Sequence, residues 1–404
     1  MALQRRNFLK FMAAVASAVA LGKLTSCTQL SSTPSPNSGL VDNGLGFQPL
    51  QGPLPLPTDG VELAKQSQSY STYEVVDDLV LPEGFTYDVI AAWGDKVGDS
   101  RFGYNNDYLS FVATGEGEGL LTVNFEYISG GTWMQSYAQV IGKSLPFAEV
   151  KSAAAATQGE INAFALPNDD PLKAKIQEIS REGLIDQGLG VISIKKTADG
   201  KWERTNSPMD RRITGISGLI DNRYLKSTGP AAAVFRKEQV QGYTDQLGDR
   251  IIGSFQNCAG GTTPWGTVLS AEENFQAQVP EPVYADGSSF APENCPFVIS
   301  DKQVNGRANV FGLAGNKYGW MVEIDPANPN DYGTKHTLLG RFHHEAVGVR
   351  AVEGKPLAVY SGCDRRGGHV YKFVSKGVVS NPQDKANSGL LAEGTLYAAV
   401  KIAA

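Results

Sequence analysis

The run LLTVNF at residues 120–125 is one of several short apolar segments that decide the fold of this chain. Enrichment in β-branched and aromatic residues over four to six positions is typical of β-strands. Similar runs recur at residues 190–194, 319–324, 356–360 and 369–373. Asp-Pro and Asp-Gly pairs lie between them, as at residues 325–326 and 199–200, and favour turns. The pattern therefore predicts many short strands.

One segment has helical spacing instead. DPLKAKIQEISREG at residues 170–183 places Leu172, Ile176 and Ile179 on one face, with Asp170 suited to cap the helix and Gly183 to end it. Many strands, few helices and 45 Gly with 21 Pro predict an all-β fold with a few helical insertions, a propeller or a sandwich. No exact sequence repeat distinguishes these two.

Composition limits the class of protein. The chain has 404 residues, of which 41% are hydrophobic and 19% are charged, so it can bury a large core. Its net charge is −6 and it has no basic runs, which argues against nucleic acid as a partner.

The N-terminus predicts export. RRNFLK at residues 5–10 precedes an apolar stretch at 12–22 that is too short to span a bilayer. We expect residues 1–27 to be a signal peptide of the twin-arginine (Tat) type, and the protein to be periplasmic, on the cell surface or extracellular. LTSC at residues 24–27 resembles a lipobox, so Cys27 is either a lipid anchor or removed with the signal. Residues 28–72, rich in Ser and Pro, predict a flexible spacer before a domain at 73–404.

Residues 257–275, NCAGGTTPWGTVLSAEENF, hold the densest group of chemically useful side chains. Cys258 among small residues could bind a transition metal, which a thiolate favours; a buried structural cysteine is the alternative. Glu272 and Glu273 follow a predicted strand, so only one of them faces inward. An inward carboxylate must be paired, protonated or metal-bound, whereas a solvated turn would leave both exposed.

Other turns add oxygen and nitrogen ligands. Asn124 and Glu126 share one face of a predicted strand end and suit a hard cation such as Ca²⁺. His343-His344-Glu345 offers imidazole and carboxylate, and Asp364-Arg365-Arg366 joins a carboxylate to two guanidinium groups that match phosphate oxygens. No GxSxG, HExxH, P-loop or GxGxxG motif is present, which disfavours serine hydrolases, zincins and nucleotide-binding proteins.

Read together and in order, these motifs resemble the PhoX-type alkaline phosphatase family over most of residues 75–398. The segments that carry the resemblance are FGYNNDY (102–108), NFEY (124–127), RRITG (211–215), NCAGG (257–261), PWG (264–266), EEN (272–274), YGW (318–320), GRF (340–342), HE (344–345), YSG (360–362) and YKF (371–373). The stretch from NCAGG to EEN is the most specific part.

The resemblance implies a six-bladed β-propeller whose central end holds iron and calcium, and hydrolysis of phosphate monoesters by a metal-activated oxygen nucleophile. By position, Cys258 would bind iron and Glu345 a further metal. Glu126, one or both of Glu272 and Glu273, and Asp364 would complete the metal ligands, and Arg365 or Arg366 would lie near the substrate phosphate.

Two departures from the family pattern stand out. Cys363 replaces an acidic residue usual in relatives, and relatives continue well beyond the equivalent of residues 396–399. We therefore expect a propeller that lacks its C-terminal part. The alternative function is an inactive or split propeller fragment that acts as a binding module. The sequence does not give the oligomeric state.

Overall fold

The computed structural model describes residues 62–69, 71 and 78–400. The predicted signal peptide, Cys27 and most of the predicted spacer lie outside these residues. Within the spacer, α2 (Leu63–Ser69) is helical. The described residues from Asp88 onward belong to one compact unit. The domain boundary expected at Tyr73 stays a prediction, because Tyr73 lies outside the described residues. None of the helices in the described part is long and apolar enough to cross a bilayer.

The first sheet contains the LLTVNF run and is antiparallel. Its order is β3-β4-β6-β7, and β8 also pairs with β6. The strands are β3 (Asn106–Gly115), β4 (Glu118–Phe125), β6 (Gly188–Lys196), β7 (Trp202–Arg204) and β8 (Arg211–Ile213). The hairpin of β1 (Lys96–Val97) and β2 (Ser100–Arg101) precedes it.

Two further sheets follow along the chain. The second has the order β10-β11-β14-β15-β9, in which only the β15-β9 pair is parallel. Its strands are β10 (Asn257–Thr262), β11 (Val268–Glu272), β14 (Met321–Ile324), β15 (Thr334–His336) and β9 (Lys226–Thr228). The third is an antiparallel meander of β16 (His344–Arg350), β17 (Pro356–Cys363), β18 (Val370–Val378) and β19 (Gly394–Ala398).

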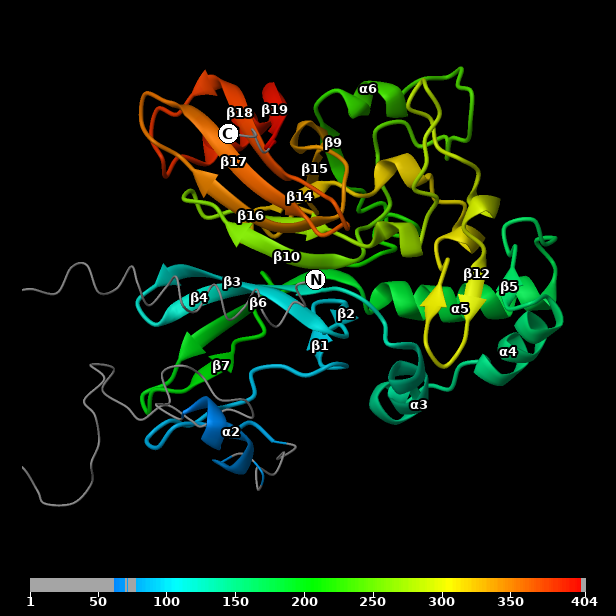
Figure 1. Ribbon diagram of the computed structural model, residues 1–404, viewed down its shortest axis with the longest axis horizontal. Coiled ribbons are helices and arrows are strands. Elements are labelled where there is room, and N and C mark those ends of the chain that lie inside the picture. The colour runs from blue at the N-terminus through cyan, green and yellow to red at the C-terminus, as the bar shows by residue number, and fades with distance from the viewer. Residues whose placement is uncertain (1–61, 70, 72–77, 401–404) are drawn as a thin grey trace, which may run out of the picture. The chain divides into compact units, whose positions relative to one another are not determined.

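Helices and a small sheet form a separate layer beside these sheets (Figure 1). They are α3 (Gly130–Ile141), α4 (Phe147–Ala156), α5 (Pro171–Ile185), and β5 (Glu160–Ile161) paired with β12 (Phe297–Ile299) and β13 (Val304–Asn305). The remaining elements are α6 (Ala231–Phe235) and the 3-10 helices η2 (Phe275–Ala277), η3 (Pro292–Asn294), η4 (Asn309–Phe311), η5 (Gly315–Lys317), η6 (Thr337–Leu339) and η7 (Lys385–Ala392).

Helix α5 begins where the sequence predicts, because the Asp170 carboxylate accepts a hydrogen bond from the Leu172 N–H at 2.7 Å. The predicted end is wrong. The helix continues through Gly183 to Ile185, and a Cβ at Gly183 would lie 2.8 Å from Cδ of Arg307. This glycine therefore makes room for a buried arginine and does not terminate the helix.

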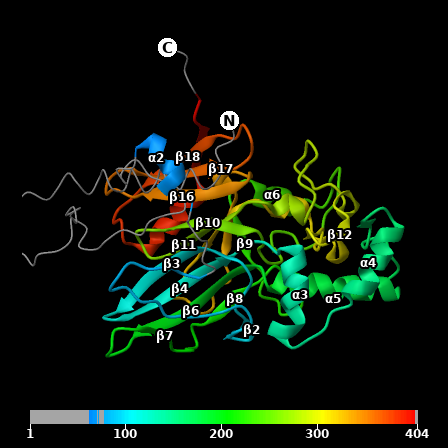
Figure 2. The same ribbon diagram turned by 60° about the horizontal axis from the view of Figure 1, so that its bottom comes forward.

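The first strands of the three large sheets, β3, β10 and β16, lie next to one another with β10 in the middle (Figures 1 and 2). Glycines in β10 permit this approach. A Cβ at Gly260 would lie 2.6 Å from the Tyr108 ring of β3, and one at Gly261 would lie 2.5 Å from the Val347 carbonyl of β16. The small residues of NCAGG thus let two neighbouring sheets approach β10.

The structure confirms a mainly β fold with helical insertions. The predicted strands at 120–125, 190–194, 356–360 and 369–373 lie wholly or largely within β4, β6, β17 and β18. Among the described residues the large sheets are open, and none closes on itself. The propeller stays a prediction.

Replacing Gly261 by Ala should destabilise the chain by about 1–3 kcal/mol, because the new methyl group would overlap the Val347 carbonyl. Chemical denaturation measures this change. Gly348→Ala in β16 is the matched control, since a Cβ there would meet nothing within 4 Å. Equal stability of the two variants would contradict the close packing of β10 against β16.

Candidate metal centre

The three large sheets repeat one local arrangement where their first strands begin. In each, the first residue of that strand pairs with the last residue of the next strand, and the register shifts immediately afterwards. The pairs are Asn106 with Phe125, Asn257 with Glu272, and His344 with Cys363. A bulge re-aims the side chains beside it, so each sheet can turn a strand residue toward a site.

The same hydrogen bond closes each arrangement. The residue after the second strand donates its N–H to the carbonyl of the residue before the first strand. The three bonds are Glu126 to Asn105 at 3.1 Å, Glu273 to Gln256 at 3.0 Å, and Asp364 to His343 at 3.0 Å. Each sheet thereby presents two groups at one end, namely Asp107 with Glu126, Cys258 with Glu273, and Glu345 with Asp364.

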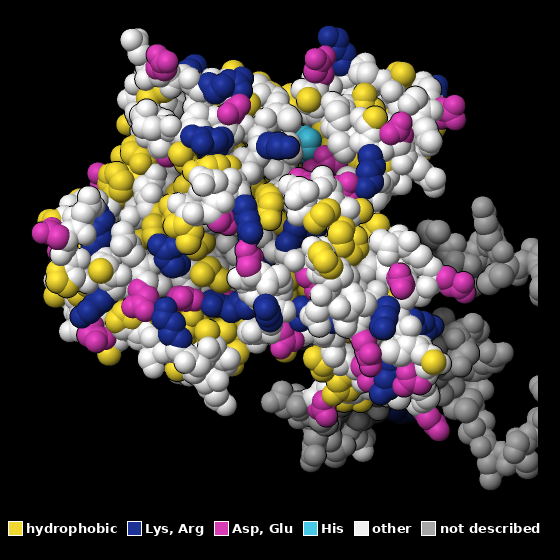
Figure 3. Space-filling model, turned by 180° about the vertical axis from the view of Figure 1, so that it is seen from behind, with side chains coloured by type: hydrophobic (Ala, Val, Ile, Leu, Met, Phe, Trp, Pro, Cys, Tyr) yellow, Lys and Arg dark blue, Asp and Glu magenta, His cyan; other side chains and the backbone are white. Residues whose placement is uncertain are grey.

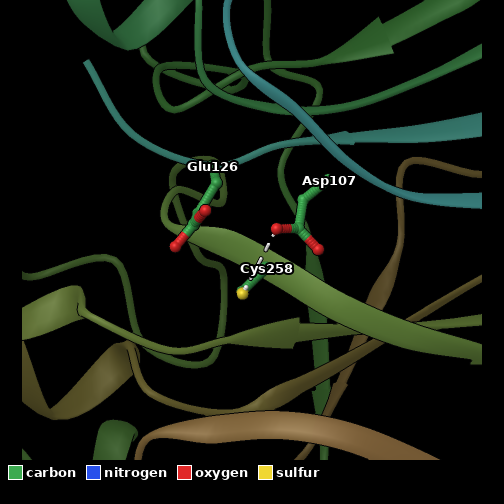
Figure 4. A group of neighbouring side chains, drawn as sticks. All are labelled: Asp107, Glu126 and Cys258. Atoms are coloured by element: carbon green, nitrogen blue, oxygen red, sulfur yellow. Dashed lines mark hydrogen bonds between the residues drawn. The ribbon is translucent and has the colours of Figure 1, made fainter. Parts of the chain in front are cut away.

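Cys258 lies at the centre of these groups. Its Sγ is 3.6 Å from Oδ2 of Asp107 and 3.4 Å from Oε2 of Glu345. Figure 4 shows the thiol projecting from β10 beside Asp107 and Glu126. Ligand atoms of Asp107, Glu126 and Cys258 lie within 4.8 Å of one another, as do those of Cys258, Glu273 and Glu345. Cys258 therefore belongs to two candidate metal-binding groups.

Burial changes across the cluster. Cys258, Glu126 and Glu273 are buried, Glu345 is half-buried, and Asp107 and Asp364 are exposed. The buried members form a floor, and the exposed members come from the first and third sheets. The cluster therefore has an exposed edge, formed by Asp107 and Asp364.

Gathering acidic groups here shifts their pKa values. Burial, followed by the charges of the surrounding carboxylates, raises the pKa of the Cys258 thiol far above its usual range. Burial, the nearby Glu345 and a hydrogen bond with Asp364 raise the pKa of Glu273 to about 9. The cluster is therefore unfavourable for negative charge unless cations are present.

The donor set fits metal ions. Carboxylate oxygens from several strands suit hard cations such as calcium, and the central thiolate suits a transition metal such as iron. Asp107, Glu126, Cys258, Glu273 and Glu345 are the residues that would hold them, with Asp364 reaching the cluster through Glu273.

Glu272 lies apart from this cluster. Its Oε1 accepts hydrogen bonds from Nζ of Lys335 at 2.7 Å and from Ser254 Oγ at 2.8 Å. Its Oε2 accepts from the N–H groups of Gly319 at 2.9 Å and Trp320 at 3.1 Å. Protein donors satisfy both oxygens, so we leave Glu272 out of the proposed metal centre.

Asn124 also differs from its expected role. Its Nδ2 donates to the carbonyls of Cys258 at 2.6 Å and Ala259 at 3.3 Å, and its Oδ1 accepts from Ser270 Oγ at 2.8 Å. Both polar ends of the amide are used within the protein. Asn124 therefore ties β4 to the backbone beside Cys258 instead of offering an oxygen to calcium.

The two arginines lie on the exposed turn after Asp364. Arg365 contacts Glu281 and His343, whereas Arg366 is exposed to solvent. Sequence reasoning missed the part played by Asp107. The available signal was its place in FGYNNDY, one residue after an Asn, as Cys258 follows Asn257.

The raised pKa of Glu273 predicts how stability depends on pH. In the metal-free chain Glu273 stays protonated until about pH 9, whereas in the unfolded chain it ionises near 4.5. Stability should therefore fall as pH rises from about 4.5 to about 9, and Glu273→Gln should flatten this fall. Denaturation of chelator-treated protein across this range measures it. Glu203→Gln on the outer strand β7 should retain the wild-type slope, and an equally steep slope in Glu273→Gln would refute the prediction.

Asn124→Ala should cost roughly 1–3 kcal/mol, because the buried Cys258 carbonyl loses its Asn124 donor and the Ser270 O–H loses its acceptor. Its free energy of unfolding can be compared with that of Asn305→Ala, whose amide bonds the exposed Gln303 side chain. Equal costs would argue against the tie between β4 and β10.

The chain was compared with family models, curated proteins and solved structures. Residues 64–403 match the family model described as alkaline phosphatase PhoX. No curated protein is significantly similar to the chain. Among solved structures, the chain is similar to Pseudomonas fluorescens PhoX in complex with vanadate, a transition state analogue, with 28% identity and a TM-score of 0.55.

That match covers 79% of this chain and 52% of the Pseudomonas chain, so the chain spans about half the length of this relative. The family model, in contrast, covers most of the chain, including every residue of the cluster. This chain belongs to the PhoX alkaline phosphatase family.

Proposed function

We propose that this chain is a metal-dependent phosphomonoesterase that hydrolyses organic phosphate esters. The observation that carries the proposal is the cluster of Cys258 with carboxylates from three sheets, open to solvent on one side. The vanadate bound to the Pseudomonas relative supports a phosphoryl substrate. We further propose that calcium and iron are the metals and that the three sheets are blades of a propeller.

The residues divide the chemistry between them. Cys258, Glu126 and Glu273 form a rigid buried floor, while Asp107, Glu345 and Asp364 border the solvent side. When bound, metal cations supply Lewis-acid chemistry that stabilises negative charge on a transferring phosphoryl group. On the face that Figure 3 shows, basic and acidic side chains are interspersed. Recognition of an ester would then depend on individual groups near the cluster, and Arg365 on the turn after Asp364 is the candidate that we propose.

Export by the Tat route fits this proposal, because that route carries folded proteins, often with metals already bound. Cys27 as a lipid anchor remains part of the proposal. Both features concern residues outside the described part of the chain.

The proposal predicts calcium-dependent hydrolysis of p-nitrophenyl phosphate by the purified chain at alkaline pH, abolished by a calcium chelator. Glu345→Gln should lower this activity by at least about 10- to 100-fold, since it removes a candidate ligand. Glu353→Gln, an exposed glutamate in the turn between β16 and β17, is the matched control.

Metal analysis of the same samples separates the alternatives. Iron should be present in the wild type and lost in Cys258→Ala; unchanged stoichiometric iron would contradict the role of Cys258. Bound metal without turnover would favour a binding module over an enzyme.

A further inference from the structure

Arg365 is an exposed side chain with two fixed partners. It lies on the turn after β17, and half of its side-chain surface is exposed. Its Nη2 donates to Oε1 of Glu281 and to Nε2 of His343, the latter at 2.9 Å. A long arginine on a turn would otherwise sample many rotamers.

Glu281 is held rigidly. It lies between Pro280 and Pro282, whose rings fix the backbone φ angle on both sides. Its carbonyl accepts a hydrogen bond from Nη1 of Arg341 at 2.7 Å. Nε of the same guanidinium donates to the Tyr318 carbonyl at 2.7 Å. Arg341 therefore links the backbone of Glu281 to that of Tyr318, which lies just before strand β14 of the second sheet.

His343 is equally fixed. It is 8% exposed, and its ring packs edge-on against Phe275 with centroids 5.6 Å apart. Its carbonyl receives the Asp364 N–H at the edge of the metal centre. Both acceptors of Arg365 are thus better anchored than Arg365 itself, whose own turn contains Gly367 at φ 77°.

The guanidinium keeps donors for a ligand. Within the described residues, Nε and Nη1 of Arg365 make no hydrogen bond to protein. Arg365 follows Asp364, which hydrogen-bonds Glu273 of the cluster. Nε and Nη1 of Arg365 thus remain available on the exposed turn that begins beside Asp364.

We propose that Glu281 and His343 are positioning residues that hold the Arg365 guanidinium ready to bind the phosphate group of the substrate. This inference rests on the proposed phosphatase function. Fixing one end of the guanidinium removes the ordering cost that a free arginine would bear on binding. If Glu281 instead occupied Arg365 and repelled phosphate, its removal would strengthen phosphate binding.

The test measures inorganic phosphate affinity by calorimetry, and KM and kcat for p-nitrophenyl phosphate, on the metal-loaded full chain. Glu281→Ala should weaken phosphate binding and raise KM by about 10-fold with a much smaller change in kcat. Glu281→Gln, which keeps an acceptor oxygen, should fall between. Glu293→Ala in η3 removes an equal charge from an exposed site and should match wild type.

A double-mutant cycle tests whether Glu281 acts through Arg365. Arg365→Ala and the double variant Arg365→Ala/Glu281→Ala should bind phosphate equally. Tighter binding by Glu281→Ala, or additive losses in the double variant, would overturn the inference. If the wild-type chain binds phosphate and Glu281→Ala binds it equally well, the inference is refuted and the proposed function stands. If the wild-type chain neither binds phosphate nor turns over the ester, both the proposed function and the inference are refuted.

Discussion

The close approach of β3 and β16 to β10 is the constraint on which the rest of this structure depends. Neither Gly260 nor Gly261 has room for a side chain, because the Tyr108 ring and the Val347 carbonyl occupy that space. With larger residues the neighbouring strands would move apart, and Asp107 and Glu345 would leave the Cys258 thiol. Packing between sheets thus sets the ligand geometry more directly than any single hydrogen bond does.

The cluster shows how a fold can tolerate a group of acids that destabilises it. Three sheets use the same bulge and the same backbone hydrogen bond, so the positions of Glu126, Glu273 and Asp364 are fixed by main chain. Asn124 and the buried Glu272–Lys335 pair reinforce the strands around them. Buried carboxylates that repel one another destabilise the fold locally, and such departures from the most stable arrangement are expected at functional sites.

The order of residues along the chain predicted the features that depend on neighbouring residues, namely strands, turns and a helix cap. Alternation and turn residues predicted strands such as β4 and β17 and the cap at Asp170. Alternation also predicted that only one of Glu272 and Glu273 faces inward, which is wrong, because both are buried: Glu272 against Lys335 and Glu273 in the cluster around Cys258. Non-local contacts could not be predicted. The buried Glu272 is paired with Lys335, which lies on another strand. The bulge that recurs in the three large sheets is also not visible in the sequence, because the three copies share backbone geometry but have different side chains.

The charges of the candidate site couple the binding of metal cations to the binding of phosphate. Without cations, the carboxylates around Cys258 would repel a phosphate dianion, and the raised pKa of Glu273 reflects the same crowding. Cations bound to these carboxylates would reverse the sign of the local electric field. The affinity for phosphate should therefore rise as cations bind, and by thermodynamic linkage bound phosphate should strengthen the binding of the cations. Arg365 adds a fixed positive group on the solvent side. The charge of Arg365 is permanent, whereas that of the cluster depends on bound metal, so in the phosphate site that we propose only the contribution of the cluster would change when metal is removed.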